Sequence, residues 1–218
     1  MRIQVNRVAA PVTVLGPGRR IGLWVQGCVL ACPGCASVDT WDPAAGRTHD
    51  VDELSATIVA EILRRGLDGL TLTGGEPLDQ APALAELVGN VRGRLTALRE
   101  GPELDVLMFT GYPLTVARKR AGGLWELLDA AVCGRYRQDL PGNQTLLASS
   151  NQELAVISSG GALRYPPTEE ANRMQILMSE GELVMIGLPR PGDLDVMAER
   201  LRERGVELGG ISWRSWDH

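Results

Sequence analysis

Residues 28–35 read Cys-Val-Leu-Ala-Cys-Pro-Gly-Cys and place three thiols on one short segment. The segment follows a short apolar stretch, Ile21 to Gln26, which is typical of a strand that delivers the chain to a loop. Three cysteines within eight positions are too crowded to staple a chain of 218 residues with disulfides, so the pattern indicates a metal or redox centre. A 4Fe-4S cluster bound by Cys28, Cys32 and Cys35 would keep one iron open for a substrate, whereas electron carriers usually supply four cysteines.

A structural zinc site is the main alternative interpretation of the three cysteines. Zinc of this kind requires a closed tetrahedral shell, and the sequence offers no fourth cysteine or histidine close by. His49 and Cys133 are the remaining candidates for a fourth ligand, although Cys133 lies in an apolar stretch typical of a small buried side chain. The zinc alternative therefore stays open at this point.

A glycine-rich turn, Thr73-Gly74-Gly75-Glu76-Pro77, follows the predicted strand Leu70 to Thr73. Such turns between a strand and a helix are common and weak evidence alone. After a three-cysteine loop the turn gains a physical role, because backbone without side chains lets a ligand approach closely and offers carbonyls to an ammonium group. Thr110-Gly111-Tyr112 also ends a predicted strand, so the three segments are expected to meet at one edge of a sheet.

Apolar stretches and helical patterns alternate along most of the chain. The predicted strands and helices are, in chain order, a strand at Ile3–Val14, the strand at Ile21–Gln26, a helix at Asp52–Arg65, the strand at Leu70–Thr73, a helix at Ala81–Leu98, a strand at Val106–Thr110, helical material at Leu114–Leu128 and a strand at Ala130–Cys133. This order predicts an α/β fold with a parallel sheet, either open or partly rolled into a barrel.

The pattern changes after Met174. We expect strands at Gln175–Met178 and Leu183–Ile186, a helix at Leu194–Arg204 and a last strand near Ile211. This segment is predicted to be a small C-terminal α+β appendage. Trp213 and Trp216 are candidates for interface anchors within it, or for residues that cap a core.

The composition excludes some partners. A hydrophobic content of 44% predicts a globular core, while a net charge of −5 argues against a protein that neutralises nucleic-acid phosphates. No run of about 18 apolar residues is present, and the first residues lack a secretory pattern, so we expect a cytoplasmic protein without membrane contact. With two histidines, the chain has little to draw on for histidine-based acid–base or zinc chemistry.

Together the cysteine triplet and the Gly-Gly-Glu-Pro turn resemble the radical S-adenosylmethionine superfamily. Further motifs resemble the family of activating proteins of anaerobic ribonucleotide reductase, and these are Gly16-Pro17-Gly18-Arg19, Gln26-Gly27-Cys28, Cys32-Pro33-Gly34-Cys35, Thr40-Trp41-Asp42, Thr110-Gly111-Tyr112 and Ser149-Ser150-Asn151-Gln152. The resemblance covers roughly residues 10 to 157. Many superfamily members have an aromatic residue just before the third cysteine, near the adenine, but Gly34 stands here, as it does in this subgroup.

The resemblance implies a partial (β/α) barrel over residues 1–167, with residues 168–218 as the appendage. It implies that S-adenosylmethionine binds the open iron of a 4Fe-4S cluster and is cleaved reductively to a 5'-deoxyadenosyl radical, which abstracts hydrogen from a glycine of a partner protein. The implied metal ligands are Cys28, Cys32 and Cys35, and the implied cofactor-binding residues are Gly34, Gly74, Gly75, Glu76, Pro77, Thr110 and Tyr112. No further catalytic side chain is implied, and the electron donor would be a protein such as flavodoxin or ferredoxin.

Two other functions remain open at this point. The segment after about Pro167 departs from the compact activating proteins, so a radical enzyme that modifies a peptide or a small molecule is a competing hypothesis. A non-catalytic zinc or iron-sulfur electron-transfer module is the third.

Overall fold

The computed structural model describes residues 1–98, 103–142, 144–166, 174–179 and 182–207. Its strands are β1 (Arg2–Val12), β2 (Arg20–Val25), β3 (Arg47–Asp50), β4 (Gly69–Gly74), β5 (Asp105–Thr110), β6 (Ala130–Cys133), β7 (Glu153–Val156), β8 (Met174–Ser179) and β9 (Glu182–Gly187). Its α-helices are α1 (Val51–Arg65), α2 (Ala81–Ala97), α3 (Leu114–Ala121), α4 (Ser159–Arg164) and α5 (Asp193–Glu203). Three short 3-10 helices complete the described elements, η1 (Val38–Thr40), η2 (Pro77–Gln80) and η3 (Gly122–Leu127).

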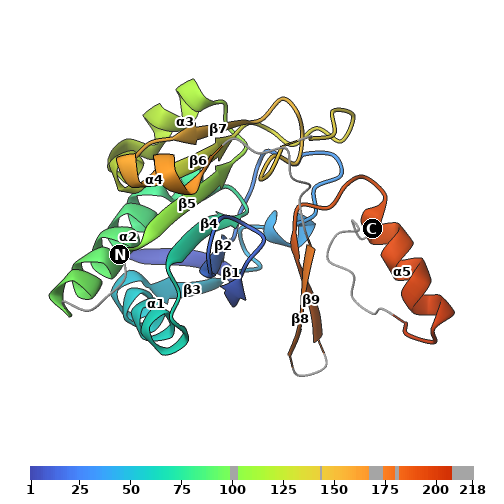
Figure 1. The fold of residues 1–218 in the computed structure, drawn as a ribbon, viewed down its shortest axis with the longest axis horizontal. Helices are drawn as coiled ribbons and strands as arrows, with labels where there is room; N and C mark the ends of the chain where they lie inside the picture. The colour runs from blue at the N-terminus through green and yellow to red at the C-terminus, as the bar shows by residue number, and fades with distance from the viewer. Residues whose placement is uncertain (99–102, 143, 167–173, 180–181, 208–218) are drawn as a thin grey trace.

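Seven strands form one sheet in the order β3-β1-β2-β4-β5-β6-β7 (Figure 1). The central strands β2, β4, β5 and β6 are parallel to their neighbours in this group, as the sequence predicts. The strands β1, β3 and β7 run antiparallel to the strands they pair with, so the sheet is mixed. The short connection through Gly16-Pro17-Gly18 allows β1 and β2 to pair only as an antiparallel hairpin, because a parallel pair needs a long crossover.

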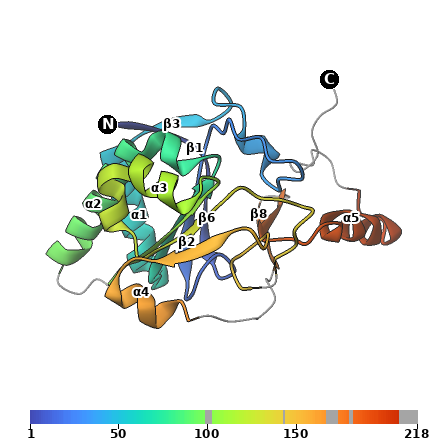
Figure 2. The ribbon, with the colours of Figure 1, turned by 90° about the horizontal axis from the view of Figure 1, so that it is seen from above.

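Helices α1, α2 and α3 cover one face of the sheet, as Figure 2 shows. Alternate strand residues point to this side, for example Leu70 and Leu72 of β4, both completely buried. The predicted helix after Asp50 is confirmed, since the Asp50 carboxylate accepts the N–H groups of Asp52 and Glu53 at its start. These parallel strands and helices place the ends of β2, β4 and β5 on one edge.

The C-terminal hairpin of β8 and β9 covers part of the opposite face of the sheet, beside β1 and β2. Ile186 is 2% exposed and packs in a cluster with Val12, Leu15 and Trp24. The Gln175 side chain fixes the hairpin to the end of β1, since it accepts a hydrogen bond from the N–H of Thr13 at 3.0 Å and donates to the carbonyl of Pro11 at 2.8 Å. The hairpin therefore docks on the sheet, while α5 projects away from it (Figure 1).

A cluster of buried polar side chains lies at the edge of the sheet where the parallel strands start. Arg20 is completely buried and pairs with Asp105 at 2.5 Å, and the Tyr165 hydroxyl donates to the same carboxylate at 2.5 Å. Since each charge is paired and hydrogen-bonded, this group ties the segment after α4 to the strands β2 and β5. It lies at the starts of the parallel strands, away from the edge where their loops meet.

Several predicted elements are confirmed within about two residues, including β2, α1, β4, α2, β5 and β6. The helical stretch predicted at Leu114–Leu128 divides into α3 and η3. Strands β3 and β7 and helix α4 are not among the predicted elements. The predicted boundary at 167/168, the strand near Ile211 and both Trp213 and Trp216 lie outside the described residues.

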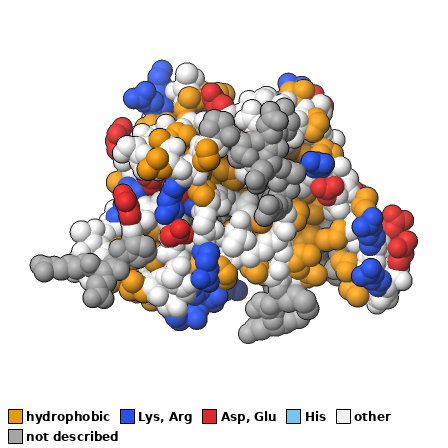
Figure 3. All heavy atoms as spheres, in the orientation of Figure 1, with side chains coloured by type: hydrophobic (Ala, Val, Ile, Leu, Met, Phe, Trp, Pro, Cys, Tyr) orange, Lys and Arg blue, Asp and Glu red, His pale blue; other side chains and the backbone are white. Residues whose placement is uncertain are grey.

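Hydrophobic side chains gather on the surface at the hairpin and α5 (Figure 3). Ile176 is 53% exposed, Met174 38% and Val196 49%. Within the described ranges, no helix has both the length and the apolar character that crossing a bilayer requires.

Candidate metal and cofactor site

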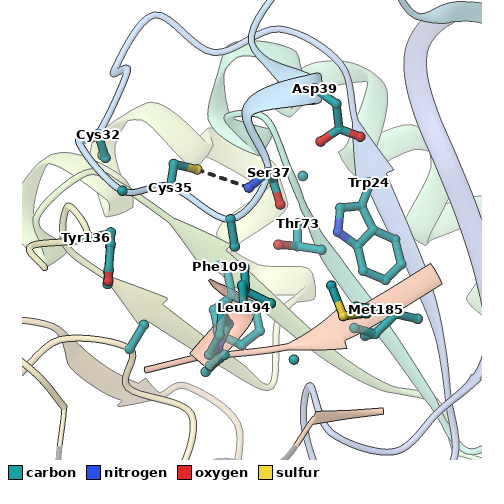
Figure 4. A pocket seen from close by; sticks show the side chains of 18 of the residues that line it. Trp24, Cys32, Cys35, Ser37, Asp39, Thr73, Phe109, Tyr136, Met185 and Leu194 are labelled. Atoms are coloured by element: carbon teal, nitrogen blue, oxygen red, sulfur yellow. Dashed lines mark hydrogen bonds between the residues drawn. The ribbon is translucent and has the colours of Figure 1, made fainter. Parts of the chain in front are cut away.

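A cavity of about 1040 Å³ opens at the edge where the parallel strands end. The cluster loop, which we define as residues 28–35, forms one wall, and the turn after β4 forms another. The hairpin strand β9 contributes residues 183–187 on the opposite side. In Figure 4 the side chains of Cys32 and Cys35 lie above Phe109, and Met185 and Trp24 lie beside it. The structure thus brings the predicted motifs together with a segment that was not predicted to be near them.

The cluster loop starts from a fixed point at the end of β2. Gln26 is 3% exposed, and its side-chain amide donates to the carbonyls of Asp39 at 3.0 Å and Asp42 at 2.6 Å. Backbone N–H groups of Gly27 and Cys28 donate to Thr40 and Trp41. These hydrogen bonds join residues 26–28, which enter the loop, to residues 39–42, which follow it, and so close the loop at its base.

The thiols of the cluster loop lie in a half-buried environment. All three are free and intermediate in exposure. Burial raises the pKa of Cys28 and of Cys35, while nearby backbone N–H groups lower it in part. One of these, the N–H of Ser37, donates to the Cys35 sulfur at 3.4 Å. These thiols are suited to metal binding, because a metal replaces the proton that burial otherwise favours.

The cysteines fit an iron-sulfur cluster by the chemistry of their donor atoms. Thiolates are the usual ligands of such clusters, with one thiolate on each ligated iron. Among the residues that the structure describes, no three His, Cys, Asp or Glu side chains gather closely enough to hold a single metal ion. All three cysteines nevertheless line the same cavity, as do Gly34, Gly74, Gly75, Glu76 and Thr110.

The glycine turn is packed tightly against the start of the cluster loop. Gly75 donates its N–H to Val25 at 2.8 Å, and Glu76 donates to Gly27 at 2.8 Å. A Cβ atom on Gly75 would overlap the backbone carbonyl of Gly27, so only glycine fits there. The sequence therefore needs Gly75 for this close approach between two loops.

Glu76 is 1% exposed, and its carboxylate is held by the protein itself. It accepts hydrogen bonds from the N–H of Leu78 at 2.9 Å, the hydroxyl of Thr110 at 2.8 Å and the N–H of Gly111 at 2.9 Å. Burial raises the pKa of Glu76, and these hydrogen bonds oppose that shift. The side chain thus ties the turn after β4 to the end of β5.

Two predicted site residues are not among those that line the cavity. Tyr112 stacks under the guanidinium of Arg120, 4.5 Å from its ring centre, and Pro77 is buried at the start of η2. The candidates for a fourth ligand are also outside the cavity lining. His49 lies on β3, and Cys133 is 1% exposed in the core on the helix side.

Sequence reasoning missed a group at the side of the cavity. Arg7 pairs with Asp39 at 2.6 Å and lies over the ring of Trp24, at 5.1 Å from its centre. All three residues line the cavity. The alternation of β1 and β2 could have placed Arg7 and Trp24 on the face away from the helices, but no sequence motif links them to the cysteines.

Comparison with known proteins places the chain among proteins that carry a 4Fe-4S cluster domain. Residues 14–155 match the model of a family described as a 4Fe-4S single cluster domain. Related proteins from three organisms bear the name anaerobic ribonucleoside-triphosphate reductase-activating protein. The one from Enterobacteria phage T4 is 30% identical over 65% of this chain and 86% of its own length. The one from Vibrio cholerae is 33% identical over 59% of this chain and 82% of its own length. The one from Escherichia coli K12 is 32% identical over 65% of this chain and 92% of its own length.

The chain belongs to this family of anaerobic ribonucleoside-triphosphate reductase-activating proteins. Its similarity to a solved structure, that of QueE from Escherichia coli, is distant, with 19% identity, a TM-score of 0.40 and coverage of 51% of this chain and 53% of that chain. That similarity is too weak to bear on the fold or the site. The matched family region ends at residue 155, before the hairpin that lines the cavity.

Proposed function

We propose that this protein is a radical S-adenosylmethionine enzyme that activates a glycyl-radical enzyme such as anaerobic ribonucleotide reductase. One observation carries the proposal, namely that the three cysteines and the Gly74-Gly75-Glu76 turn line a single cavity. Cys28, Cys32 and Cys35 are the proposed ligands of a 4Fe-4S cluster. Such a cluster, when bound, supplies the electron that cleaves S-adenosylmethionine to a 5'-deoxyadenosyl radical.

The glycine turn is the proposed binding site for the methionine end of the cofactor. An ammonium group only donates hydrogen bonds, so the backbone groups of the turn that suit it are carbonyl oxygens. The N–H groups of Gly75 and Glu76 are already bonded within the protein. Gly34 and Thr110, which line the cavity, are proposed to border the remainder of the cofactor. Pro77 and Tyr112 support the turn and the strand end from outside the lining, and we propose that they shape the site indirectly.

The cavity is large enough for a second occupant. Pockets of about 300–1,000 Å³ enclose a drug-sized ligand, and this one slightly exceeds that range. The relatives are named for the activation of a ribonucleotide reductase, so we propose that the second occupant is a glycine-bearing segment of such a partner. The proposed electron donor is a protein such as flavodoxin or ferredoxin.

The architecture is proposed to be an incomplete (β/α) barrel over residues 1–167, with the appendage from 168 onward. The parallel group β2-β4-β5-β6 supports the first part of this proposal. Docking of the hairpin through Gln175 and Ile186 supports an appendage that packs on the core.

Anaerobic reconstitution with iron and sulfide, followed by S-adenosylmethionine and a strong reductant, tests the reaction. We expect a brown protein with broad absorption near 400 nm and stoichiometric 5'-deoxyadenosine. Addition of a glycyl-radical reductase from the same organism should then give the radical signal of a glycine in electron paramagnetic resonance. A protein that binds the cluster but forms no 5'-deoxyadenosine would be an electron carrier, and the proposal would fail.

A second candidate is an enzyme of the same chemistry that modifies a peptide or a small molecule. The hairpin favours it, because residues 183–187 line the cavity and lie beyond the matched family region. The reductase partner separates the two candidates. Both enzymes would form 5'-deoxyadenosine, but the first candidate alone would form a glycyl radical on the reductase.

A further inference from the structure

The connection between β6 and β7, residues 134–152, folds back on itself. Ser150 donates its N–H to the carbonyl of Leu140 at 2.8 Å, and Gly142 donates to Ala148 at 3.2 Å. Pro141 and Ser149 form an isolated β-bridge. The two ends of this connection are thereby brought together next to the cluster loop.

Three side chains at the end of the connection hold the backbone at its start. The Ser149 hydroxyl accepts the N–H of Arg137 at 3.2 Å. The Asn151 amide donates to the carbonyl of Arg135, and the Gln152 amide donates to the carbonyl of Gly134, each at 2.9 Å. All three side chains belong to the Ser149-Ser150-Asn151-Gln152 motif, to which the proposed reaction assigns no role.

The Gln152 amide is bonded on both sides. Its carbonyl oxygen accepts the N–H groups of Ala148 at 2.9 Å and Ser149 at 3.1 Å. Ser149 itself is completely buried. The Gln152 amide uses both its N–H donor and its carbonyl acceptor, and Ser149 and Asn151 add further hydrogen bonds. The orientation of the segment 134–137 is therefore fixed by several hydrogen bonds rather than by one.

The start of the connection, residues 134–138, lies against the cluster loop. The Arg135 guanidinium donates to the carbonyl of Leu30. The Gln138 side chain occupies the space that a Cβ atom on Gly34 would need. Tyr136 lines the same cavity as Cys35 (Figure 4), and burial together with the charge of Cys35 raises the pKa of Tyr136.

The cluster loop needs such support. Val29 at its tip is 81% exposed, and Ala31 has a φ of 45°, a left-handed conformation that disfavours residues other than glycine. Strained conformations of this kind persist only where the surrounding structure holds them. The contact of Arg135 with Leu30 acts on the residue next to Ala31, from a different part of the sheet.

We propose that Ser149, Asn151 and Gln152 are positioning residues that hold residues 134–138 as a brace against the cluster loop, with Arg135 as the point of contact. The proposal rests on the proposed function in that the braced loop is the metal site. The contacts themselves lie within the chain and exist without a cofactor. The brace also accounts for Gly34, since a larger residue there would displace Gln138.

The test compares Arg135→Ala with Arg137→Ala. The control removes a guanidinium from the same connection, one that pairs on the surface with Asp139 at 2.6 Å. Hydrogen exchange of residues 29–34 is measured by mass spectrometry on the full chain without metal, and iron retention against a chelator is measured after reconstitution. We expect Arg135→Ala to raise exchange and iron loss several-fold, Arg135→Lys to recover part of the effect and Arg137→Ala to match the wild type.

Asn151→Ala tests the motif itself. Since Asn151 acts through Arg135, the variant should reproduce the effect of Arg135→Ala, and the double variant should add little to either single one. Equal exchange in Arg135→Ala and Arg137→Ala would overturn the brace, as would full additivity in the double variant. If Arg135→Ala fails to fold, Arg135→Lys and Asn151→Ala decide the question by the same measurements.

The exchange experiment separates this proposal from the proposed function. It uses neither iron nor S-adenosylmethionine, so a several-fold change in residues 29–34 would support the brace even in a protein that forms no 5'-deoxyadenosine. Unchanged exchange in a protein that does form 5'-deoxyadenosine would reject the brace and leave the reaction standing.

Discussion

The loops that follow β2 and β4 start side by side and differ sharply in how they are held. Val25 and Gly74, which end the two strands, are partners in the parallel ladder. The turn after β4 is closed, with Glu76 1% exposed and bonded three times within the protein. The cluster loop after β2 is open, with Val29 81% exposed. We call the turn the platform, because its carboxylate is buried and hydrogen-bonded to the turn and to the end of β5. We call the cluster loop the open loop, because its tip is exposed.

The difference matches the tasks we propose for the two loops. A platform with fixed carbonyls can orient a cofactor without moving, since a site gains precision when its own groups are locked. A metal site on an open loop can be loaded from outside, but it depends on Gln26 at its base and on Arg135 at its tip. Substitutions in the two loops should therefore fail in different ways.

Replacing a cysteine of the open loop has the largest expected effect. Cys32→Ala should abolish the absorption near 400 nm and reduce bound iron to a small fraction of the wild-type amount, because three thiolates are needed to hold the cluster. Iron and sulfide analysis after anaerobic reconstitution checks this. Cys133→Ala is the matched control, since Cys133 is buried in the core. It should keep the cluster and cost about 1 kcal/mol of stability.

A methyl group on the platform has the next largest effect. Gly75→Ala would force the turn away from the carbonyl of Gly27. Overpacking of this kind costs about 1–3 kcal/mol, and the same loss in binding free energy would lower the affinity for S-adenosylmethionine roughly 5- to 150-fold. Equilibrium binding to the reconstituted protein measures it, with iron content unchanged.

Gly89→Ala controls for the platform substitution. Gly89 is exposed on α2 and an added Cβ meets nothing within 4 Å. Alanine should therefore raise stability by up to about 1 kcal/mol and leave binding unchanged. Wild-type affinity in Gly75→Ala would show that the turn does not contact the cofactor.

The base of the open loop is the next target. Gln26→Ala removes the hydrogen bonds to the carbonyls of Asp39 and Asp42 inside the protein. We expect a loss of about 1–2 kcal/mol in the free energy of unfolding of the metal-free protein, measured in urea. Gln4→Ala serves for comparison, because the Gln4 amide donates to Thr48 at the exposed edge, and it should cost about 0.5 kcal/mol. Equal losses in the two variants would mean that Gln26 does not carry the loop.

The platform and the open loop also differ in how far their sequence predicts them. The cysteine spacing and the Gly-Gly-Glu-Pro turn identify both loops, and alternating strands and helices predict that they share an edge of the sheet. Both predictions depend on local pattern, which the sequence carries directly. The contacts that hold the open loop do not follow from local pattern. Gln26 bonds to Asp42, and Arg135 bonds to Leu30, between segments that are separated in the sequence.

The part of the cavity wall formed by β9 was likewise predictable as a strand but not in its position. The pattern predicts a strand at Leu183–Ile186, and β9 confirms it. Nothing in the local sequence states that this strand docks beside Trp24, because that depends on which apolar face of the sheet the helices leave uncovered. Antiparallel β3 and β7 escaped prediction for a related reason: each has four residues, too few for a clear period of two.

The smallest expected effect is the pH dependence of the platform. Burial raises the pKa of Glu76 above its ordinary value of 4.5, so the folded state binds the proton more tightly than the unfolded state does. Between 4.5 and the raised pKa the wild-type protein should lose stability as pH rises, and above that pKa the loss should level off. Glu76→Gln cannot titrate there.

The difference in unfolding free energy between Glu76→Gln and wild type should therefore shift toward the variant as pH rises, by roughly 1.4 kcal/mol for each unit by which the pKa is raised. Urea unfolding of the metal-free proteins from pH 4.5 to 7.5 measures it, and other titrating groups cancel in the difference. A shift of opposite sign would mean that the three hydrogen bonds to the carboxylate outweigh its burial. The platform would then be held by a charged group, and the contrast with the open loop would be one of charge as well as of exposure.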